Sequence, residues 1–433
     1  MTYQQTLDYL FTALPMFSRI GAAAYKKDLT NTIRLCEALG NPHQAFRTVH
    51  VGGTNGKGSV SHMLAAILQE SGHKTGLYTS PHLYDFRERI RIDGSMMEED
   101  DVVRFVQEIG PLIESIQPSF FEITVAMAFH HFAKNKVDIA VIEVGLGGRL
   151  DSTNIITPEV SVITNIGWDH MNMLGDSLEA IAAEKAGIIK PGVPTVIGQR
   201  GPQTDPVFEQ KAAAEGSPLY FAEDRFTVGQ YELAHEGVEL TVTDNRDHSL
   251  QRYRLDLGGI YQTKNLPAVL QAAELLGDRI PDKTAITSAL EKVKSLTGLS
   301  GRWEIIHQHP SVVLEVAHNP DGIQEMLRHL EHLQFDQLHI VLGMVKDKDP
   351  GPVLSLLPKN ATYYFTHAHI PRALEASALQ EAATPNGLHG NTFDNVNDAI
   401  SNAMASAAGS DLIIVCGSIF LVAEVDKERV KGR

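Results

Sequence analysis

The sequence predicts an α/β protein of two domains. The N-terminal domain would hold a phosphate-binding loop (P-loop) on a mostly parallel sheet with a small antiparallel subsheet, and the C-terminal domain would be Rossmann-like α/β. Three observations predict this. Apolar strand runs alternate with helical segments over residues 46–197, apolar–polar alternation follows at 218–258, and strand–helix alternation restarts after the link LTGLSG. The predicted domains are residues 1–296 and 297–433, with a hinge near 297–300.

The parallel sheet of the N-terminal domain is predicted from five apolar runs. Segments with helical periodicity lie between several of them, and such βαβ units place helices on both faces of a parallel sheet. Alternation within 218–258 predicts half-exposed antiparallel strands, and NLPAVLQAAELLG predicts a helix after them. The five runs are FRTVHV, KTGLYTS, VDIAVIEV, EVSVITNI and VPTVIG, and the alternating residues are Val238, Leu240 and Val242, then Tyr253, Leu255 and Leu257.

The strands of the C-terminal domain are predicted from four further apolar runs with helices between them. Because the alternation restarts after the link, these strands belong to a second α/β domain rather than to the first sheet. The runs are SVVLEVA, LHIVLGMV, ATYYFTHA and DLIIVCGS.

Composition places the chain among ordinary globular proteins, with 433 residues, 43% hydrophobic and 21% charged. We expect no membrane association and no secretory leader, because no run of about 18 apolar residues and no basic-then-apolar start is present. The formal net charge of −16 argues against nucleic-acid binding. Cys36 and Cys416 offer neither a disulfide framework nor metal-ligand spacing, so we expect both in the core of a cytoplasmic protein.

The segment VGGTNGKGS, residues 51–59, predicts a phosphate-binding loop between a strand and a helix. Glycines at such a turn let backbone N–H groups approach phosphate oxygens, and Lys57 would reach the β/γ-phosphates. The match to G-x-x-x-x-G-K-[ST] is imperfect, because Gly58 stands where a hydroxyl is expected and Ser59 comes one place later. The helix is predicted from one buried face, formed by Val60, Met63, Leu64, Ile67 and Leu68.

Polar residues end three neighbouring strand runs. Glu143 closes VDIAVIE, His170 follows VSVITNIGWD, and Ser80 closes KTGLYTS. Carboxyl ends of parallel strands meet at one edge, where phosphates bind, and a carboxylate there suits Mg²⁺. Each residue alone also fits a plainer role: a solvated carboxylate, a hydrogen-bonding histidine or the start of a turn. Their convergence on one edge of the sheet favours a site.

Lys185 in SLEAIAAEKAGIIKPG lies near the C-terminal end of a helix that Gly187 stops. A lysine there complements the helix dipole, and the residues alone favour that structural role over a catalytic one.

Read together, these motifs resemble the folylpolyglutamate synthase and dihydrofolate synthase family, which belongs to the Mur ligase superfamily. The resemblance covers about residues 15–425. It rests on GTNGKGS, TSPHL, EVGLGGRLDSTN, IGWDHMNMLG, EKAGIIK, YQTKN, SGRWE, AHNPDG and CGSIF, in that order. A Mur ligase acting on peptidoglycan precursors would carry a further domain before the loop. Because the loop begins at residue 52 here, we expect only a short helical lead-in before it, which argues against such a ligase.

The resemblance implies an ATP site with two Mg²⁺ ions. One ion would be held by Ser80 and Glu143 and the second by Glu143 and His170, so Ser80 would replace the displaced hydroxyl of the loop. Lys185 matches a lysine that this family carries as an N6-carboxylated (carbamylated) side chain. The implied ATP-binding residues are Thr54, Asn55, Gly56, Lys57, Gly58, Ser59, Asn265, Arg302 and Glu315, and the implied catalytic residues are Lys57, Lys185, His318 and Arg89.

The resemblance also implies sites for the other two substrates, a reduced folate or dihydropteroate and L-glutamate. The chain departs from the family at Glu315-Val316, where the family usually shows Asp-Gly, and this puts the ribose contact of residue 315 in question. The implied pterin-binding residues are Ser119, Phe120, Phe121, Glu122, Leu150, Asp151 and Ser152, and the implied glutamate-binding residues are Arg89, His318 and Ser418.

The implied activity is ATP-dependent ligation of glutamate to a folate through an acyl phosphate, by a monomer, together with glutamate addition to dihydropteroate. Closure of two hinged domains would exclude water from the acyl phosphate. Two alternatives stay open: a Mur-type ligase acting on a non-folate carboxylate, and a nucleotide-binding regulatory module without catalysis. The presence together of Glu143, His170, Lys185 and His318 argues against the second.

Overall fold

The computed structural model describes residues 1–16, 28–234 and 237–432 and confirms the predicted fold class. The chain divides into two compact units. Unit 1 comprises Met1–Glu232, Val238–Asp256 and Gln262–Leu299, and unit 2 is mainly Ser300–Arg433 and also takes in Leu257–Tyr261. Each unit is described by itself.

Unit 1 is built on an eight-stranded sheet, counted over the described residues, in the order β4-β3-β2-β5-β1-β6-β7-β8. Neighbours from β2 to β8 are parallel, whereas β3 and β4 pair antiparallel at one edge. Each of the five predicted runs contributes a strand. Bounds are β1 (Arg47–Gly52), β2 (Thr75–Tyr78), β3 (Ile90–Ile92), β4 (Ser95–Met96), β5 (Ile139–Glu143), β6 (Val160–Ile163), β7 (Thr195–Ile197) and β8 (Leu219–Phe221).

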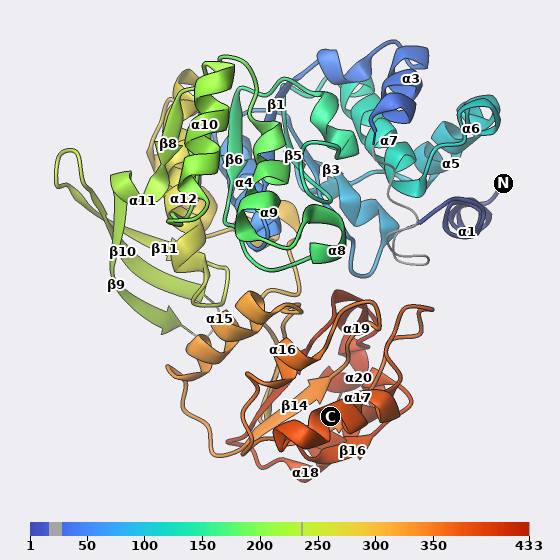
Figure 1. Cartoon of the computed structure of the whole chain (residues 1–433), viewed down its shortest axis with the longest axis vertical. Coiled ribbons are helices and arrows are strands. Elements are labelled where there is room, and N and C mark those ends of the chain that lie inside the picture. The colour runs from blue at the N-terminus through green and yellow to red at the C-terminus, as the bar shows by residue number, and fades with distance from the viewer. Residues whose placement is uncertain (17–27, 235–236, 433) are drawn as a thin grey trace. The chain divides into compact units, whose positions relative to one another are not determined.

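Helices cover both faces of this sheet (Figure 1). A core of aromatic and aliphatic residues, including Tyr78, Phe105, Phe129 and Phe132, fills the space under α1 and α5–α7. The α-helices are α1 (Tyr3–Ala13), α3 (Thr30–Ala38), α4 (Lys57–Glu70), α5 (Glu99–Glu108), α6 (Gly110–Ile116), α7 (Phe120–Lys134), α8 (Met171–Leu174), α9 (Leu178–Lys185), α10 (Asp205–Glu215), α11 (Ala222–Arg225), α12 (Gln262–Leu275), α13 (Thr284–Leu290) and α14 (Val293–Thr297). The 3₁₀ helices are η2 (Pro42–Gln44), η3 (Phe86–Arg89), η4 (Ser152–Ile155), η5 (Ala186–Ile188) and η6 (Gly277–Arg279).

Helix α4 differs from its prediction, because it is buried on all sides rather than on one face. It packs against β1, β2 and β5 on one side and against α12, α13 and α14 on the other. Its polar residues therefore need internal partners. Nδ1 of His62 and Oγ1 of Thr297 lie 2.8 Å apart, and Gln262 donates to Oγ of Ser59 over 3.2 Å.

The predicted antiparallel subsheet is a three-stranded sheet, as far as the described residues show, in the order β11-β10-β9. Strand β10 presents Val238, Leu240 and Val242 to the interior, as their alternation predicts. The bounds are β9 (Phe226–Ala234), β10 (Gly237–Asp244) and β11 (Leu250–Leu255).

Unit 2 has a six-stranded sheet, counted over the described residues, in the order β12-β13-β17-β14-β15-β16. Only the β12–β13 pair among them is antiparallel, and each of the four predicted runs forms a strand. Strand bounds are β12 (Glu304–Gln308), β13 (Ser311–Leu314), β14 (Leu338–Leu342), β15 (Thr362–Phe365), β16 (Gly390–Thr392) and β17 (Leu412–Cys416). Helix bounds are α15 (Pro320–Leu330), α16 (Gly351–Leu354), α17 (Ala376–Ala383), η7 (Thr384–Asn386), α18 (Val396–Ser406), α19 (Ile419–Ala423) and α20 (Lys427–Lys431).

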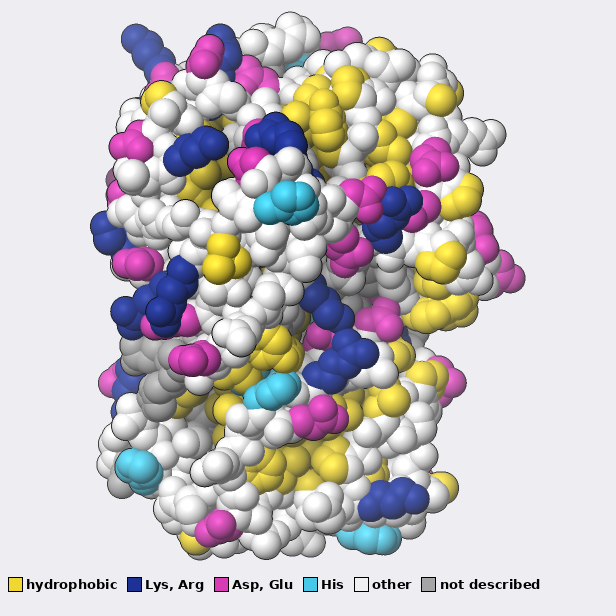
Figure 2. Space-filling model, turned by 90° about the vertical axis from the view of Figure 1, so that its left-hand side faces the viewer, with side chains coloured by type: hydrophobic (Ala, Val, Ile, Leu, Met, Phe, Trp, Pro, Cys, Tyr) yellow, Lys and Arg dark blue, Asp and Glu magenta, His cyan; other side chains and the backbone are white. Residues whose placement is uncertain are grey.

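Basic and acidic side chains are interspersed on the face of the molecule shown in Figure 2, and no large area of that face is of one sign. In the part of the chain that the structure describes, none of the helices combines the length and apolar character needed to cross a membrane. Cys36 and Cys416 are free cysteines, and both are buried, as predicted.

Candidate active site

The loop after β1 is held by the chain that follows β6. The backbone N–H of Thr54 donates to the carbonyl of Asn165 over 2.9 Å, and that of Asn55 donates to Oδ1 of Asn165 over 2.8 Å. Thr164 donates to the carbonyl of Asn55 over 2.6 Å. Neither Thr164 nor Asn165 was predicted as part of the site. The signal that could have found them is their position at a strand end beside the loop.

Gly53 and Gly56 are required by close packing. Gly53 has φ of +136°, and a Cβ there would lie 1.9 Å from Oγ1 of Thr164. Gly56 has φ of +83°, and a Cβ there would lie 2.3 Å from Oδ1 of Asn265. This places Asn265, on α12, directly against the loop, and its nucleotide role stays a prediction.

We predict that Gly53→Ala lowers the stability of the protein far more than Gly72→Ala. Both glycines have positive φ, but Gly72 has no atom within 4 Å of an added Cβ. Backbone strain alone is expected to cost about 1 kcal/mol, and the clash with Thr164 should raise the cost to about 3 kcal/mol or more. Thermal melting of the two variants measures the difference. Equal shifts would contradict the close packing.

Two lysine side chains converge on the carbonyl of Gly53. Nζ of Lys185 donates to it over 2.8 Å and Nζ of Lys57 over 3.2 Å, while Lys57 also donates to the carbonyl of Thr54. Lys185 is only 4% exposed. Burial, then the charge of Lys57, lowers the pKa of Lys185 to about 7, against the opposing charges of Asp169 and Asp151. A substantial fraction of this amine is therefore neutral near pH 7.

Ser80 and Glu143 lie together at the carboxyl edge of the sheet. Glu143 pairs in register with Val51 on β1, and Ile142 with Tyr78 on β2. The backbone N–H of Ser80 donates to Oε2 of Glu143 over 3.2 Å, and the Glu143 side chain is buried. The phosphate loop, Glu143 and Ser80 thus meet at one edge of the sheet. The expected convergence of His170 with them stays a prediction.

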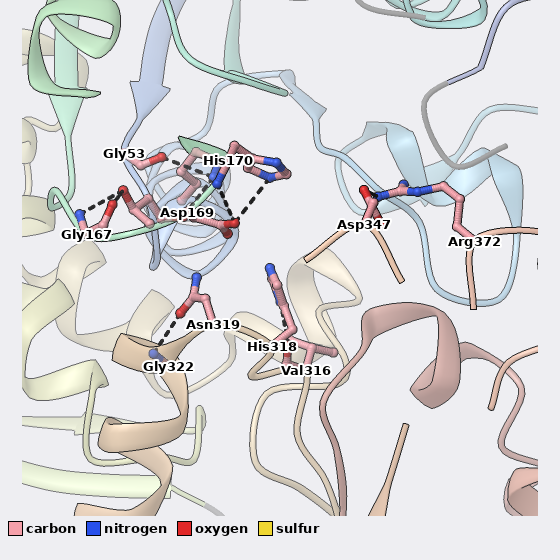
Figure 3. Close-up of polar contacts among 12 residues, drawn as sticks. Gly53, Gly167, Asp169, His170, Val316, His318, Asn319, Gly322, Asp347 and Arg372 are labelled. Carbon is pink, nitrogen blue, oxygen red and sulfur yellow. Dashed lines mark hydrogen bonds and ion pairs between the residues drawn. The ribbon is translucent and has the colours of Figure 1, made fainter. Parts of the chain in front are cut away.

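His170 follows β6 with a left-handed backbone, φ 53°, immediately before α8. Its backbone N–H donates to Oδ1 of Asp169 over 2.8 Å, and its Nε2 lies 3.8 Å from the same oxygen (Figure 3). Within residues 1–16, 28–234 and 237–432, no three His, Cys, Asp or Glu side chains converge to hold a metal. The implied ligand set contains only two residues of those types, since its third member is Ser80.

The turn GLGGRLD packs against the end of α9. The N–H of Arg149 donates to the carbonyl of Glu184 over 2.8 Å, and a Cβ on Gly148 would lie 2.9 Å from the carbonyl of Lys185. Leu150 is half-buried, whereas Asp151 and Ser152 are buried. Asp151 caps η4 by accepting from the N–H of Thr153 over 3.0 Å. The three predicted pterin residues therefore lie in and directly after the turn that packs against the end of α9, where Lys185 lies, and one of them, Asp151, has a structural role.

The predicted pterin segment 119–122 begins α7. Ser119 and Glu122 form a capping box, in which each side chain accepts from the backbone N–H of the other, at 3.3 and 2.6 Å. Phe120 is buried, and Phe121 lies against Gly145 and Tyr78. The pattern S-F-F-E is typical of a helix start. Ser119 and Glu122 therefore also serve to cap α7.

Arg89 is buried in unit 1, with 5% of its surface exposed. Its Nε donates to Nδ1 of His82 over 2.8 Å, and its guanidinium lies 5.3 Å from the centre of the Phe120 ring. Burial lowers the pKa of Arg89, against Tyr78 and the charges of Glu143 and Glu88. Burial, then the charge of Arg89, lowers the pKa of His82 to about 3. His82 is therefore neutral near pH 7 and accepts the hydrogen bond.

In unit 2, Glu315 ends β13 with a buried carboxylate. It accepts from Tyr261 Oη over 2.7 Å, from the N–H of Trp303 over 3.0 Å and from the N–H of Ala317 over 3.1 Å. Burial raises its pKa. The positive charge of Arg302, the residue before Trp303, opposes this effect and lowers the pKa of Glu315. The ribose role of Glu315 stays a prediction, and Tyr261 is a partner that the sequence did not indicate.

His318 and Ser418 follow neighbouring parallel strands of unit 2, β13 and β17. Nδ1 of His318 lies 2.9 Å from the carbonyl of Val316, and Asn319 caps α15 by accepting from the N–H of Gly322 (Figure 3). Ser418 caps α19 by accepting from the N–H of Phe420 over 3.2 Å. Figure 3 also shows the ion pair of Arg372 with Asp347, on the segments that follow β15 and β14.

Two family descriptions match most of the chain. They are "Mur ligase middle domain" over residues 51–273 and "Mur ligase, glutamate ligase domain" over residues 301–419. The Bacillus subtilis dihydrofolate synthase/folylpolyglutamate synthase is 32% identical over 416 residues, covering 93% of this chain and 95% of that protein. The Lacticaseibacillus casei folylpolyglutamate synthase is 32% identical over 443 residues and covers 100% of both.

A third relative is longer. The chain spans 50% of the probable bifunctional folylpolyglutamate synthase/dihydropteroate synthase of Haloferax volcanii, with 33% identity over 434 residues and 98% of this chain covered.

Two solved structures match this chain along its whole length. Folylpolyglutamate synthase of Mycobacterium tuberculosis complexed with ADP matches with a TM-score of 0.88 and 31% identity, covering 100% of this chain and 98% of that one. E. coli FolC in complex with DHPP and ADP matches with a TM-score of 0.85 and 30% identity, with the same coverage. The chain therefore belongs to the folylpolyglutamate synthase family of the Mur ligase superfamily.

Proposed function

We propose that this protein is an ATP-dependent ligase that adds L-glutamate to reduced folates and also to dihydropteroate. The main support is that, in unit 1, one edge of the sheet brings together the phosphate loop, Ser80, Glu143 and Lys185. The names of the relatives support the substrates, because those of Bacillus subtilis and E. coli name both synthase activities. ADP complexes of two relatives support ATP as co-substrate.

The nucleotide would bind on the loop between β1 and α4. Backbone N–H groups of residues 54–59 would hold its phosphates with Lys57, whose amine already lies over the loop. Asn265 lies against Gly56 and would contact the adenine. Arg302 and Glu315 of unit 2 would contact the phosphate and ribose. We assign the ATP-binding role to residues 1–296 and the glutamate-ligating role to residues 297–433.

The residues present fit Mg²⁺. The Ser80 hydroxyl and Glu143 carboxylate are oxygen donors, which this ion prefers, and they lie beside the phosphate loop. Glu143 and His170 would hold the second ion, with Lys185 supporting the site as a carbamate. Bound Mg²⁺ would neutralise charge on the phosphoryl oxygens.

The reaction would have two steps. A carboxylate oxygen of the pterin substrate attacks the γ-phosphorus of ATP, which gives an acyl phosphate and ADP. The amine of glutamate then attacks the acyl carbon, so that an amide forms and phosphate and a proton leave. Lys57 would stabilise the charge of the transferred group. Residues 119–122 and 150–152 would hold the pterin, and His318 and Ser418 would hold the glutamate.

The direct test measures glutamate-dependent ADP release with dihydropteroate and with tetrahydrofolate. We expect both pterins to stimulate release, because the chain resembles relatives with both activities in their names. Stimulation by tetrahydrofolate alone would remove the dihydrofolate synthase activity from the proposal.

Stimulation by neither pterin would contradict the folate assignment and favour a Mur-type ligase acting on another carboxylate. A monomeric state and a cytoplasmic location stay predictions, which size-exclusion chromatography and cell fractionation would check.

A further inference from the structure

Arg89 is a buried cation. In the part of the chain that the structure describes it forms no ion pair, whereas Arg87, two residues earlier, is bound by Asp85 at 2.8 Å. Arg89 is nonetheless only 5% exposed to solvent. Burying an unpaired charge is costly, and buried charges in proteins are normally paired, so a bound anion would offset the cost at Arg89.

The orientation of Arg89 is fixed by His82. Nε donates to Nδ1 of His82 over 2.8 Å. The imidazole contacts the rings of Phe11 and Phe86, with centroid distances of 6.2 and 6.1 Å. Because Nε is engaged, the other end of the planar guanidinium, which carries the Nη groups, is directed away from His82. That end is the one that binds a carboxylate with two parallel hydrogen bonds.

The surroundings of Arg89 indicate which anion it would meet. Its carbonyl accepts from the N–H of Thr79, the residue before Ser80. Glu143 acts on it electrostatically without forming an ion pair. Its guanidinium lies over Phe120, in the segment assigned to the pterin. All of these residues belong to unit 1. Arg89 therefore lies between the strand ends that would hold the metal and the segment that would hold the pterin.

We propose that Arg89 binds the pterin-linked carboxylate that becomes phosphorylated, and that His82 is the positioning residue that aims it. This rests on the proposed function and replaces the assignment of Arg89 to the incoming glutamate. The other residues expected to hold glutamate, His318 and Ser418, belong to unit 2, whereas the described contacts of the Arg89 side chain are with unit 1 residues. His82 lies within the motif TSPHL, but the family resemblance implies no role for its side chain.

The test measures KM for the pterin substrate and for glutamate in four variants. For Arg89→Met we expect KM for either pterin to rise about 100-fold, because a charge-assisted pair is lost, with KM for glutamate nearly unchanged. His82→Leu, which removes the acceptor, should raise KM for the pterin about 10-fold. His82→Asn keeps an acceptor oxygen near the position of Nδ1 and should restore most of the affinity. Arg89→Met with His82→Leu should be no worse than Arg89→Met alone, because His82 acts through Arg89.

Arg91→Met is the matched control. Arg91 is also buried, lies two residues further on in β3 and donates to the carbonyl of Gly94 over 2.9 Å. Arg91→Met should leave both KM values within about 2-fold of the wild type, because the Arg91 guanidinium binds the carbonyl of Gly94, whereas that of Arg89 binds His82.

Three results would overturn the proposal. The first is a rise in KM for glutamate instead of the pterin in Arg89→Met, which would return Arg89 to the glutamate site. The second is failure of His82→Asn to improve on His82→Leu. The third is full additivity in the double variant. In each case a wild-type enzyme with pterin-dependent turnover leaves the proposed function standing, whereas a wild type without any such turnover overturns both.

Discussion

Glu143→Gln is expected to lower turnover by about 1,000-fold or more, because it removes the carboxylate charge from the proposed metal site. The fold should survive. Glutamine keeps an oxygen that can accept from the N–H of Ser80, which is the contact that Glu143 makes in the structure. Turnover at saturating Mg²⁺ and thermal melting measure the two effects separately.

Glu159→Gln is the control for this variant. Glu159 precedes β6, and it pairs with Arg47 and Arg279 at the surface, away from the strand ends that carry the site. Its loss should change turnover little. Unchanged turnover of Glu143→Gln at saturating Mg²⁺ would refute the metal-ligand role of Glu143.

Lys185→Ala is expected to lower activity by about 100-fold or more, and short carboxylates such as acetate are expected to restore part of it. The reason is that a carbamate on Lys185 would place a negative group beside the phosphate loop, and a free carboxylate could occupy the space left by the shortened side chain. The structure favours carbamate formation. Burial lowers the pKa of this amine to about 7, so the neutral form that attacks CO₂ is available near neutral pH.

Lys190→Ala is the matched control for the rescue. Lys190 lies five residues further on and donates to the carbonyl of Asn154 over 2.8 Å, outside the proposed site. Its activity should not respond to added carboxylates. Full activity of Lys185→Ala, or rescue of both variants alike, would rule out the carbamate. Mass spectrometry of the native protein should show the carboxylated lysine directly.

The strand-end residues show how much of the site the sequence could predict. Ser80 and Glu143 were expected to meet because parallel neighbours bring their carboxyl ends to one edge, and they do meet. Lys185 could not be placed in this way. Its position near a helix end is the same for a structural and a catalytic lysine, and only the packing of α9 against the GLGG turn brings its amine to the carbonyl of Gly53.

Contacts between residues far apart in sequence were not predictable from local pattern. His82 was not singled out, and its acceptor role depends on the side-chain orientation of Arg89. Tyr261 and Glu315 are 54 positions apart, yet the hydroxyl of one satisfies the carboxylate of the other. Helix α4 was expected to bury one face. The spacing of apolar residues identifies that face, but it does not show that α12–α14 cover the opposite one.

The sequence by itself determined the succession of strands and helices along the chain, the phosphate loop, the family and the edge of the sheet at which the site lies. These follow from apolar periodicity, glycine spacing and the rule that parallel strands align their ends. Only the tertiary structure decided which polar groups are buried and paired. Burial lowers the pKa of both Lys185 and Arg89, because desolvation depends on every element packed around a group and not on its neighbours in sequence.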